Sequence, residues 1–165
     1  MQKHLFFICP TDYLESVIDS TFKQKKYYYS SLGNSIAFDA ETAGQLSELL
    51  HAENITEVSF VLSDDNRIVF DALERQNFSE IAGLKDAYTQ ITRQKKHAEK
   101  SWQTHDHQFL LLSYYLNNRV RELKQQFKGK AVNQLKVNGI VYRRKKKQFS
   151  EIYPDLVCRE SYALN

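Results

Sequence analysis

Residues 55–66 read ITEVSFVLSDDN, and this stretch decides the fold that the sequence predicts. Its first eight residues, Ile55–Leu62, form a mostly apolar run of the length typical of a buried strand. Four polar residues follow, and apolar side chains then return at helical spacing over residues 68–73. We therefore predict a strand, a polar connection and a short helix in this part of the chain.

The same order of elements precedes this stretch twice. Leu5–Cys9 is a short apolar strand, after which Thr11 or Asp12 is placed to cap a helix. Lys26–Ser30, which contains three consecutive tyrosines, is a second strand, and Asp39 can cap the next helix. Strands that alternate with helices at these intervals indicate parallel βαβ units.

The pattern changes in the second half of the chain. Helical periodicity covers Ile81–Lys100 and Phe109–Phe127, and an alternating strand covers Gln134–Tyr142. We predict that Arg143–Lys147 is a hairpin turn and that Gln148–Tyr153 returns as the partner strand.

These elements predict an α/β fold in a single Rossmann-like domain over residues 1–165. Helices are expected to flank a central, mostly parallel sheet, and a C-terminal strand or hairpin is expected to complete it. The core of the domain is residues 5–153, and residues 154–165 form a tail.

Composition narrows the class of protein. Hydrophobic residues make up 42% of the 165 residues and charged residues 26%, which is ordinary globular usage and argues against disorder. The apolar runs are far shorter than the ~18 residues that span a membrane, so we expect no membrane insertion. Two cysteines make no disulfide framework, which favours a cytoplasmic location.

The net charge of +3 hides an asymmetry along the chain. Residues 39–75 hold nine acidic and two basic residues, a formal charge of −7. Residues 119–147 hold eleven basic residues and one acidic residue, a formal charge of +10. Opposite charges can steer one copy of the chain onto another, so we expect a homo-oligomer, most simply a homodimer.

Several segments resemble, in the same order, the β-class carbonic anhydrases. Gly33-Asn34 and Asp39-Ala-Glu-Thr42 resemble that family's Asn-Ala-Gly-Asn turn and the start of its next helix. Glu57–Asp64 resembles the strand that runs into the family's Gly-His-Ser-x-Cys-Gly motif. Phe6–Cys9 lies where its Cys-x-Asp-Ser-Arg motif begins, and Leu135–Tyr142 resembles its closing strand, Val-x-Gly-x-x-Tyr. The resemblance covers residues 5–153 and implies a β-carbonic anhydrase-like fold.

The same resemblance implies which residues stand at the family's zinc site. That family binds Zn²⁺ through Cys, His and Cys and holds an Asp-Arg dyad near the metal. Cys9 matches the first ligand, but the dyad positions fall on Thr11 and Tyr13. The histidine position falls on Leu62 and the second cysteine position on Asp65. The chain is therefore similar to a degenerate member that lacks most of the zinc ligands.

Catalytic zinc needs about three protein ligands and an open position for water. We accordingly expect no cofactor and no catalytic residues of the family's kind. If the chain holds a metal, its candidate ligands are Cys9 and Asp65.

Polar side chains follow the predicted strands and form a candidate ligand pocket. In open parallel sheets, ligands bind beyond the carboxyl ends of the strands, where these residues lie. The alternative is that Ser63 or Asp64 caps the next helix and that the other acids are solvated. The candidate pocket residues are Cys9, Asp12, Asn34, Ser63, Asp64, Asp65, Asn66 and Arg67.

Five adjacent bases form a candidate basic patch at the predicted hairpin. Such a run attracts phosphates without sequence preference, and it is also typical of a solvated hairpin tip that protects a sheet edge. The patch residues are Arg143, Arg144, Lys145, Lys146 and Lys147.

Histidines offer little metal-binding potential. His105-Asp106-His107 can share one ion only on a loop, because residues i and i+2 of a helix point apart. His4, His51 and His97 have no partner at a useful spacing.

The sequence favours a non-catalytic carbonic anhydrase-like protein that binds a small ligand or a protein partner. Two alternatives stay open. One is an active zinc-dependent carbonic anhydrase or lyase whose ligands are rearranged onto Cys9, Asp12, Asp65 and a histidine of the later helices. The other is a nucleic-acid binder that uses the basic residues of 119–147, although nucleic acid is not the partner we expect.

Overall fold

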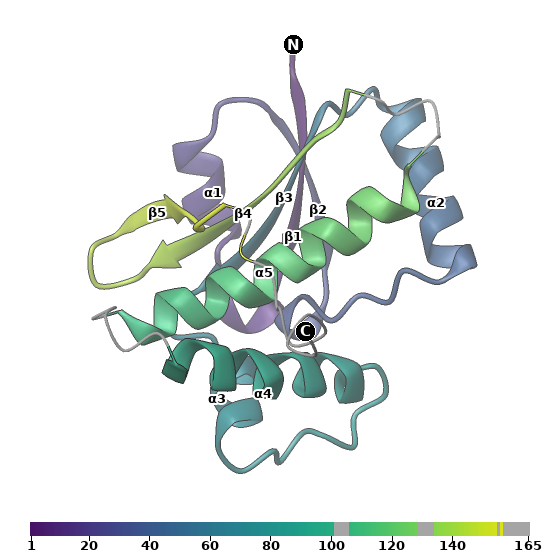
Figure 1. Ribbon diagram of the computed structural model, residues 1–165. Coiled ribbons are helices and arrows are strands. Elements are labelled where there is room, and N and C mark those ends of the chain that lie inside the picture. The colour runs from purple at the N-terminus through teal and green to yellow at the C-terminus, as the bar shows by residue number, and fades with distance from the viewer. Residues whose placement is uncertain (101–105, 129–133, 155, 157–165) are drawn as a thin grey trace.

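The computed structural model describes residues 1–100, 106–128, 134–154 and 156, and Figure 1 shows their arrangement. A five-stranded sheet with the order β2-β1-β3-β4-β5 forms its centre. Strands β1 to β4 are parallel, and β5 is antiparallel to β4. The predicted α/β fold, with a mostly parallel sheet and a C-terminal hairpin, is confirmed. The strands are β1 (Lys3–Ile8), β2 (Lys25–Ser30), β3 (Glu57–Ser63), β4 (Lys136–Arg143) and β5 (Gln148–Glu151).

Helices cover both faces of the sheet. On one face, Leu14 and Ile18 at the start of α1 (Glu15–Thr21) pack against apolar residues of β1, β3 and β4. On the other face, α5 lies across the strands, and α4 packs on α3 and α5 (Figure 1). The helices of this second face are α2 (Ala40–Ala52), α3 (Arg67–Leu73), α4 (Leu84–Lys100) and α5 (His107–Gln126).

Strand β3 is the middle strand of the sheet and is buried on both faces. Its residues from Val58 to Ser63 are all buried, as expected of a parallel strand that is covered on both faces. Two 3-10 turns follow the carboxyl ends of the two strands on one side of β3: η1 (Pro10–Asp12) comes after β1, and η2 (Leu32–Asn34) comes after β2. The ends of these strands and turns therefore meet at one edge of the sheet.

Helix α5 approaches β4 closely at Gly139. A Cβ atom at this position would lie 3.1 Å from the Cβ of Leu116 on α5 and 2.7 Å from the Cδ1 of Ile152. Both distances are shorter than an ordinary van der Waals contact, so the absence of a side chain at Gly139 permits this packing.

The predicted cap of the first helix is wrong. Neither Thr11 nor Asp12 caps α1, whose N-cap residue is Leu14 and carries no side-chain cap hydrogen bond. The predicted cap of α2 is confirmed, since Asp39 Oδ1 accepts a hydrogen bond from the Thr42 N–H at 2.8 Å. The difference is that the exposed Asp39 bonds to its own helix, whereas the buried Asp12 carboxylate accepts hydrogen bonds from Ser63 and Asn66.

The cap of α3 also differs from the prediction. Asn66, not Ser63 or Asp64, begins this helix, and its Oδ1 accepts a hydrogen bond from the Val69 N–H at 2.9 Å. The tail predicted for residues 154–165 lies outside the described residues, apart from residues 154 and 156.

Candidate functional site

Asp12 is the buried centre of the polar cluster at the carboxyl ends of β1 and β3. Its side chain is 1% exposed. Its Oδ2 accepts a hydrogen bond from the Ser63 N–H at 2.9 Å, and its Oδ1 accepts one from the Asn66 amide at 2.9 Å. Burial raises the pKa of Asp12 to about 6, although the hydrogen bonds from Ser63 and Asn66 oppose this rise.

This carboxyl group could exchange a proton near neutral pH. Both of its oxygens, however, are occupied by donors from the chain itself, and the group is closed to solvent. Asp12 therefore joins η1 to the end of β3 and the start of α3, and neither of its oxygens is open to a substrate.

Arg144 of the hairpin covers this cluster from outside. Its Nε donates to Asp65 Oδ2 at 2.8 Å, and its Nη2 donates to the Asp12 carbonyl at 2.9 Å. The Arg144 N–H also donates to Asp64 Oδ1 at 3.2 Å. Burial acts to raise the pKa of Asp65, but the hydrogen bonds from Ser63 and Arg144 outweigh it and lower that pKa. Sequence reasoning missed this role of Arg144, which lies 79 residues from Asp65 along the chain.

Cys9 lies beside this cluster, at the end of β1. Its Sγ accepts a hydrogen bond from the Gly33 N–H at 3.1 Å and lies 3.1 Å from the Thr11 hydroxyl. Gly33 has a φ of 58°, and a Cβ atom there would lie 2.8 Å from Ile68 Cγ2. The hydroxyl of Tyr115, a fully buried α5 residue that sequence reasoning missed, donates to the Gly33 carbonyl at 2.7 Å.

Asn34 completes the group around Cys9. Its amide donates to the Val61 carbonyl at 3.0 Å, which ties η2 to β3. Its Oδ1 is buried and has no hydrogen-bond partner among the residues that the structure describes. The η2 turn, which carries Gly33 and Asn34, is thus held by hydrogen bonds to Cys9, to β3 and to α5.

The candidate pocket residues largely gather at one place. Asp12, Ser63, Asp65 and Asn66 form one hydrogen-bonded cluster, and Asp64 joins it through Arg144. Cys9 directly follows β1, and Asn34 lies in η2, whose Gly33 N–H bonds to Cys9 Sγ. Arg67 is the exposed first residue of α3 and stands at the margin of the group.

The residues at the expected zinc position do not fit a catalytic zinc ion. Leu62, at the histidine position, is fully buried in the apolar core with Cys9. Asp65, at the second cysteine position, is committed to Ser63 and Arg144. Within the described part of the chain, no group of three His, Cys, Asp or Glu residues is placed to hold a metal ion.

The histidines of the later helices do not change this result. His107 Nδ1 lies 3.3 Å from the Ala98 carbonyl, and the ring of His97 packs 5.9 Å from that of Tyr114. His105 and Cys158 lie outside the described residues. Asp106 caps α5 through the Phe109 N–H at 3.1 Å.

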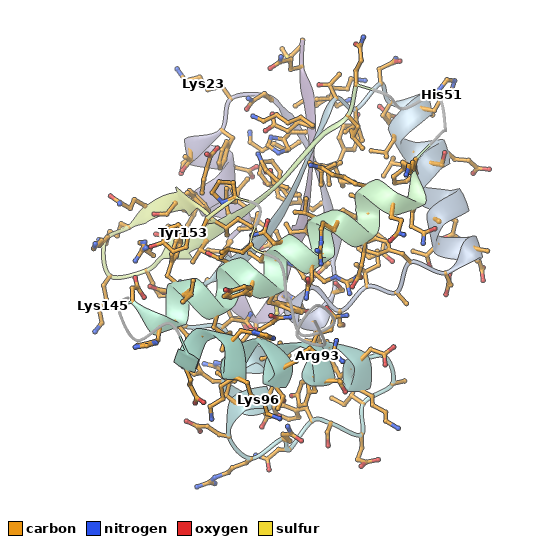
Figure 2. All side chains as sticks on the ribbon, viewed as in Figure 1. Lys23, His51, Arg93, Lys96, Lys145 and Tyr153 are labelled. Atoms are coloured by element: carbon orange, nitrogen blue, oxygen red, sulfur yellow. The ribbon has the colours of Figure 1, made fainter. Side chains whose placement is uncertain are left out.

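The basic patch divides into two parts. Arg143 pairs with Asp106 at 2.6 Å and lies over the Phe109 ring, and Arg144 binds the polar cluster. Both of these residues therefore fasten the hairpin to the body, and Arg144 is also exposed. Residues 145–147 are exposed, and Figure 2 shows Lys145 at the outer end of the hairpin.

The described helices include none that is both long enough and apolar enough to cross a membrane.

Known proteins were compared with this sequence and fold. No protein-family model matches the sequence, and no curated protein matches it. Solved structures do match. A point variant of the β-carbonic anhydrase CafD of Aspergillus fumigatus has a TM-score of 0.72 at 16% identity, over 93% of this chain and 90% of that one.

Two further solved structures also match the fold of this chain. A tetrameric β-carbonic anhydrase of Sordaria macrospora has a TM-score of 0.62 at 14% identity, over 91% of this chain and 80% of that one. The Coccomyxa β-carbonic anhydrase in complex with acetazolamide has a TM-score of 0.65 at 13% identity, over 91% and 71% of the two chains. The fold is β-carbonic anhydrase-like, as the sequence resemblance implied.

Proposed function

We propose that this chain, which has a β-carbonic anhydrase-like fold, is a non-catalytic protein that binds a small ligand or a protein partner. One observation carries the proposal. Where three metal ligands would be expected, Cys9 stands with a fully buried leucine, Leu62, and with Asp65, which is paired to Arg144. A site with a single available thiol and no open position cannot activate water by the zinc mechanism.

The polar cluster then has a structural role. Hydrogen bonds of Asp12, Asn66 and Arg144 join η1, the start of α3 and the β4–β5 hairpin. Buried polar networks that are satisfied internally rigidify a fold and leave few groups for a substrate.

Carbon dioxide hydration tests this proposal. We expect the purified, zinc-supplemented chain to hydrate carbon dioxide no faster than its Cys9→Ser variant. Asp39→Asn changes the exposed N-cap residue of α2 and leaves Cys9 in place. It is the matched control for any effect of a substitution on folding or purification. A zinc-dependent rate that Cys9→Ser abolishes and the control variant retains would favour the rearranged enzyme instead.

We also propose that the protein acts in a reducing cytoplasm as a homo-oligomer. Strand β2 lies at the end of the sheet order, and Tyr29 on it is 37% exposed. An open strand edge with an exposed aromatic side chain is a surface suited to self-association. Nucleic-acid binding is less well supported, because Arg143 and Arg144 are engaged within the chain.

A further inference from the structure

A cavity of about 590 Å³ lies between α4 and the loop of residues 74–83 that precedes it. This volume is in the range of small-molecule sites. Every residue that lines the cavity carries a polar group, and six of these residues are exposed. An incoming molecule can therefore reach their side chains from solvent. None of the lining residues belongs to the polar cluster around Asp12, so the two sites are separate.

Helix α4 forms one wall of this cavity and makes it basic. Lys85, Thr89 and Lys96 are spaced by four and seven residues, so they lie on one face of the helix. Arg93 stands one turn before Lys96, and Figure 2 labels both on α4. The lining holds these three bases and a single acid, Glu80, and a recess with this balance attracts anions.

Two of the bases have their ammonium groups available for a ligand. Neither Lys85 nor Lys96 forms an ion pair with another residue that the structure describes, and both side chains are exposed. The neighbouring Lys95 does not line the cavity and pairs with Glu99 at 4.0 Å. The positive charge that faces the cavity is therefore the charge that the chain leaves unbalanced.

The opposite wall is held in place by Asp71 of α3. Its Oδ1 accepts a hydrogen bond from the Asn77 N–H at 2.9 Å, and its Oδ2 accepts one from the Phe78 N–H at 3.0 Å. The Tyr88 hydroxyl of α4 donates to the same carboxylate. Asp71 thus fastens the loop to the helix, and the cavity between them is formed before any ligand arrives.

Exposed acceptors complete the lining. The Gln76 amide donates to the Ala72 carbonyl at 3.0 Å, which leaves Gln76 Oε1 as an acceptor. The Thr89 hydroxyl donates to the Lys85 carbonyl at 3.0 Å, so its oxygen can accept a second hydrogen bond. The Glu80 carboxylate is a further acceptor. Cationic donors and neutral or acidic acceptors in one recess suit a ligand that has both an anionic group and several hydroxyl groups.

We propose that this cavity binds a phosphorylated sugar. Its phosphate pairs with Lys96 beside Arg93, and its hydroxyl groups donate to Gln76, Thr89 and Glu80. The proposal rests on the small-ligand binding proposed above, to which it gives a ligand class and a place. It does not involve Cys9, so a failure to bind sugar phosphates and a gain of carbon dioxide hydration are separate outcomes, measured by separate assays.

Glucose 6-phosphate, glucose and inorganic phosphate provide matched probes, because each of the last two lacks one half of the first. We expect glucose 6-phosphate to bind the full chain at about 0.15 M salt and to shift the NMR signals of Thr89 and Lys96. Glucose and inorganic phosphate should each bind at least about tenfold more weakly. No binding of glucose 6-phosphate, equal binding of inorganic phosphate, or shifts confined to residues outside this cavity would overturn the proposal.

Two neighbouring lysines of α4 provide matched variants. Lys96→Gln removes the charge that faces the cavity and should weaken glucose 6-phosphate by about tenfold. Lys95→Gln removes the same charge from a lysine outside the lining and should leave the affinity unchanged. Both positions are exposed, so neither substitution disturbs the core. Equal weakening by the two variants would show unspecific attraction to a basic helix and would overturn the proposal.

Glu80→Ala separates hydroxyl recognition from attraction of the phosphate. The loss of a carboxylate should strengthen the binding of inorganic phosphate, but it also removes an acceptor for the sugar. The preference for glucose 6-phosphate over inorganic phosphate should therefore fall in this variant. An undiminished preference would contradict the role that we assign to Glu80.

Discussion

At the scale of single residues, the hydrogen-bond partner of a polar side chain depends on which groups the fold brings near it. Asp39 caps α2 through a partner three residues away, and the sequence was sufficient to predict this contact. Asp12 is also well placed for a local cap, but it finds Ser63 and Asn66, which lie 51 and 54 residues away. Sequence spacing does not contain that information.

The buried Asp12 carboxyl makes stability depend on pH. Its pKa of about 6 in the folded chain is above the ordinary value of 3.8. Between pH 3.8 and pH 6, folding is therefore coupled to the uptake of a proton by Asp12. The contribution of Asp12 to the free energy of unfolding is most favourable near pH 4 and falls as the pH rises toward 6. The loss is on the order of 3 kcal/mol.

The Asp12→Asn variant should remove this dependence. Urea unfolding of the two chains from about pH 4 to pH 7 should show the unmodified chain losing stability relative to Asp12→Asn as the pH rises. Glu41→Gln, an exposed position at the start of α2, serves as the control and should follow the unmodified chain. Parallel curves for Asp12→Asn and the unmodified chain would contradict the role assigned to burial.

At the scale of elements, the order of strands and helices could be predicted because apolar runs and their spacing are local properties. The polar row of His4, Ser59 and Asn138 could not, because its members come from three strands and meet only through the sheet register. His4 has no partner at a useful sequence spacing, yet its contacts cross the sheet. For the same reason, the pairing of Arg144 with Asp65 was not foreseen.

Two glycines provide a matched test of the packing of α5 on β4. Gly139→Ala places a methyl group 3.1 Å from Leu116 Cβ, and we expect it to destabilise the chain by about 1–3 kcal/mol. Gly44→Ala, in the exposed interior of α2, meets no atom within 4 Å and should stabilise the chain by roughly 0.5–1 kcal/mol. Thermal unfolding measures both changes. If Gly139→Ala and Gly44→Ala changed the stability equally and in the same direction, the small size of Gly139 would not limit how closely α5 approaches β4.

At the scale of the whole molecule, the proposed single domain over residues 1–165 carries a −7 segment and a +10 segment. Part of this charge is balanced internally, because Arg144 from the basic segment pairs with Asp65 from the acidic one. The remaining charge is available for association between copies.

Sedimentation at two salt concentrations tests this association. We expect a homo-oligomer at low salt that dissociates in part at high salt, since the Debye length falls from about 30 Å at 0.01 M to about 3 Å at 1 M. Charge reversal at Lys145, at the exposed tip of the hairpin, should weaken the low-salt oligomer. An oligomer that persists unchanged in high salt would show that charge does not drive the association.

We propose that this β-carbonic anhydrase-like fold lacks the catalytic metal site. Zinc content tests this most directly, measured by elemental analysis on protein that has met neither a chelator nor a metal-affinity column. We expect well under one zinc ion per chain, with the same value for Cys9→Ser. One zinc ion per chain in the unmodified protein, lost in Cys9→Ser, would contradict it.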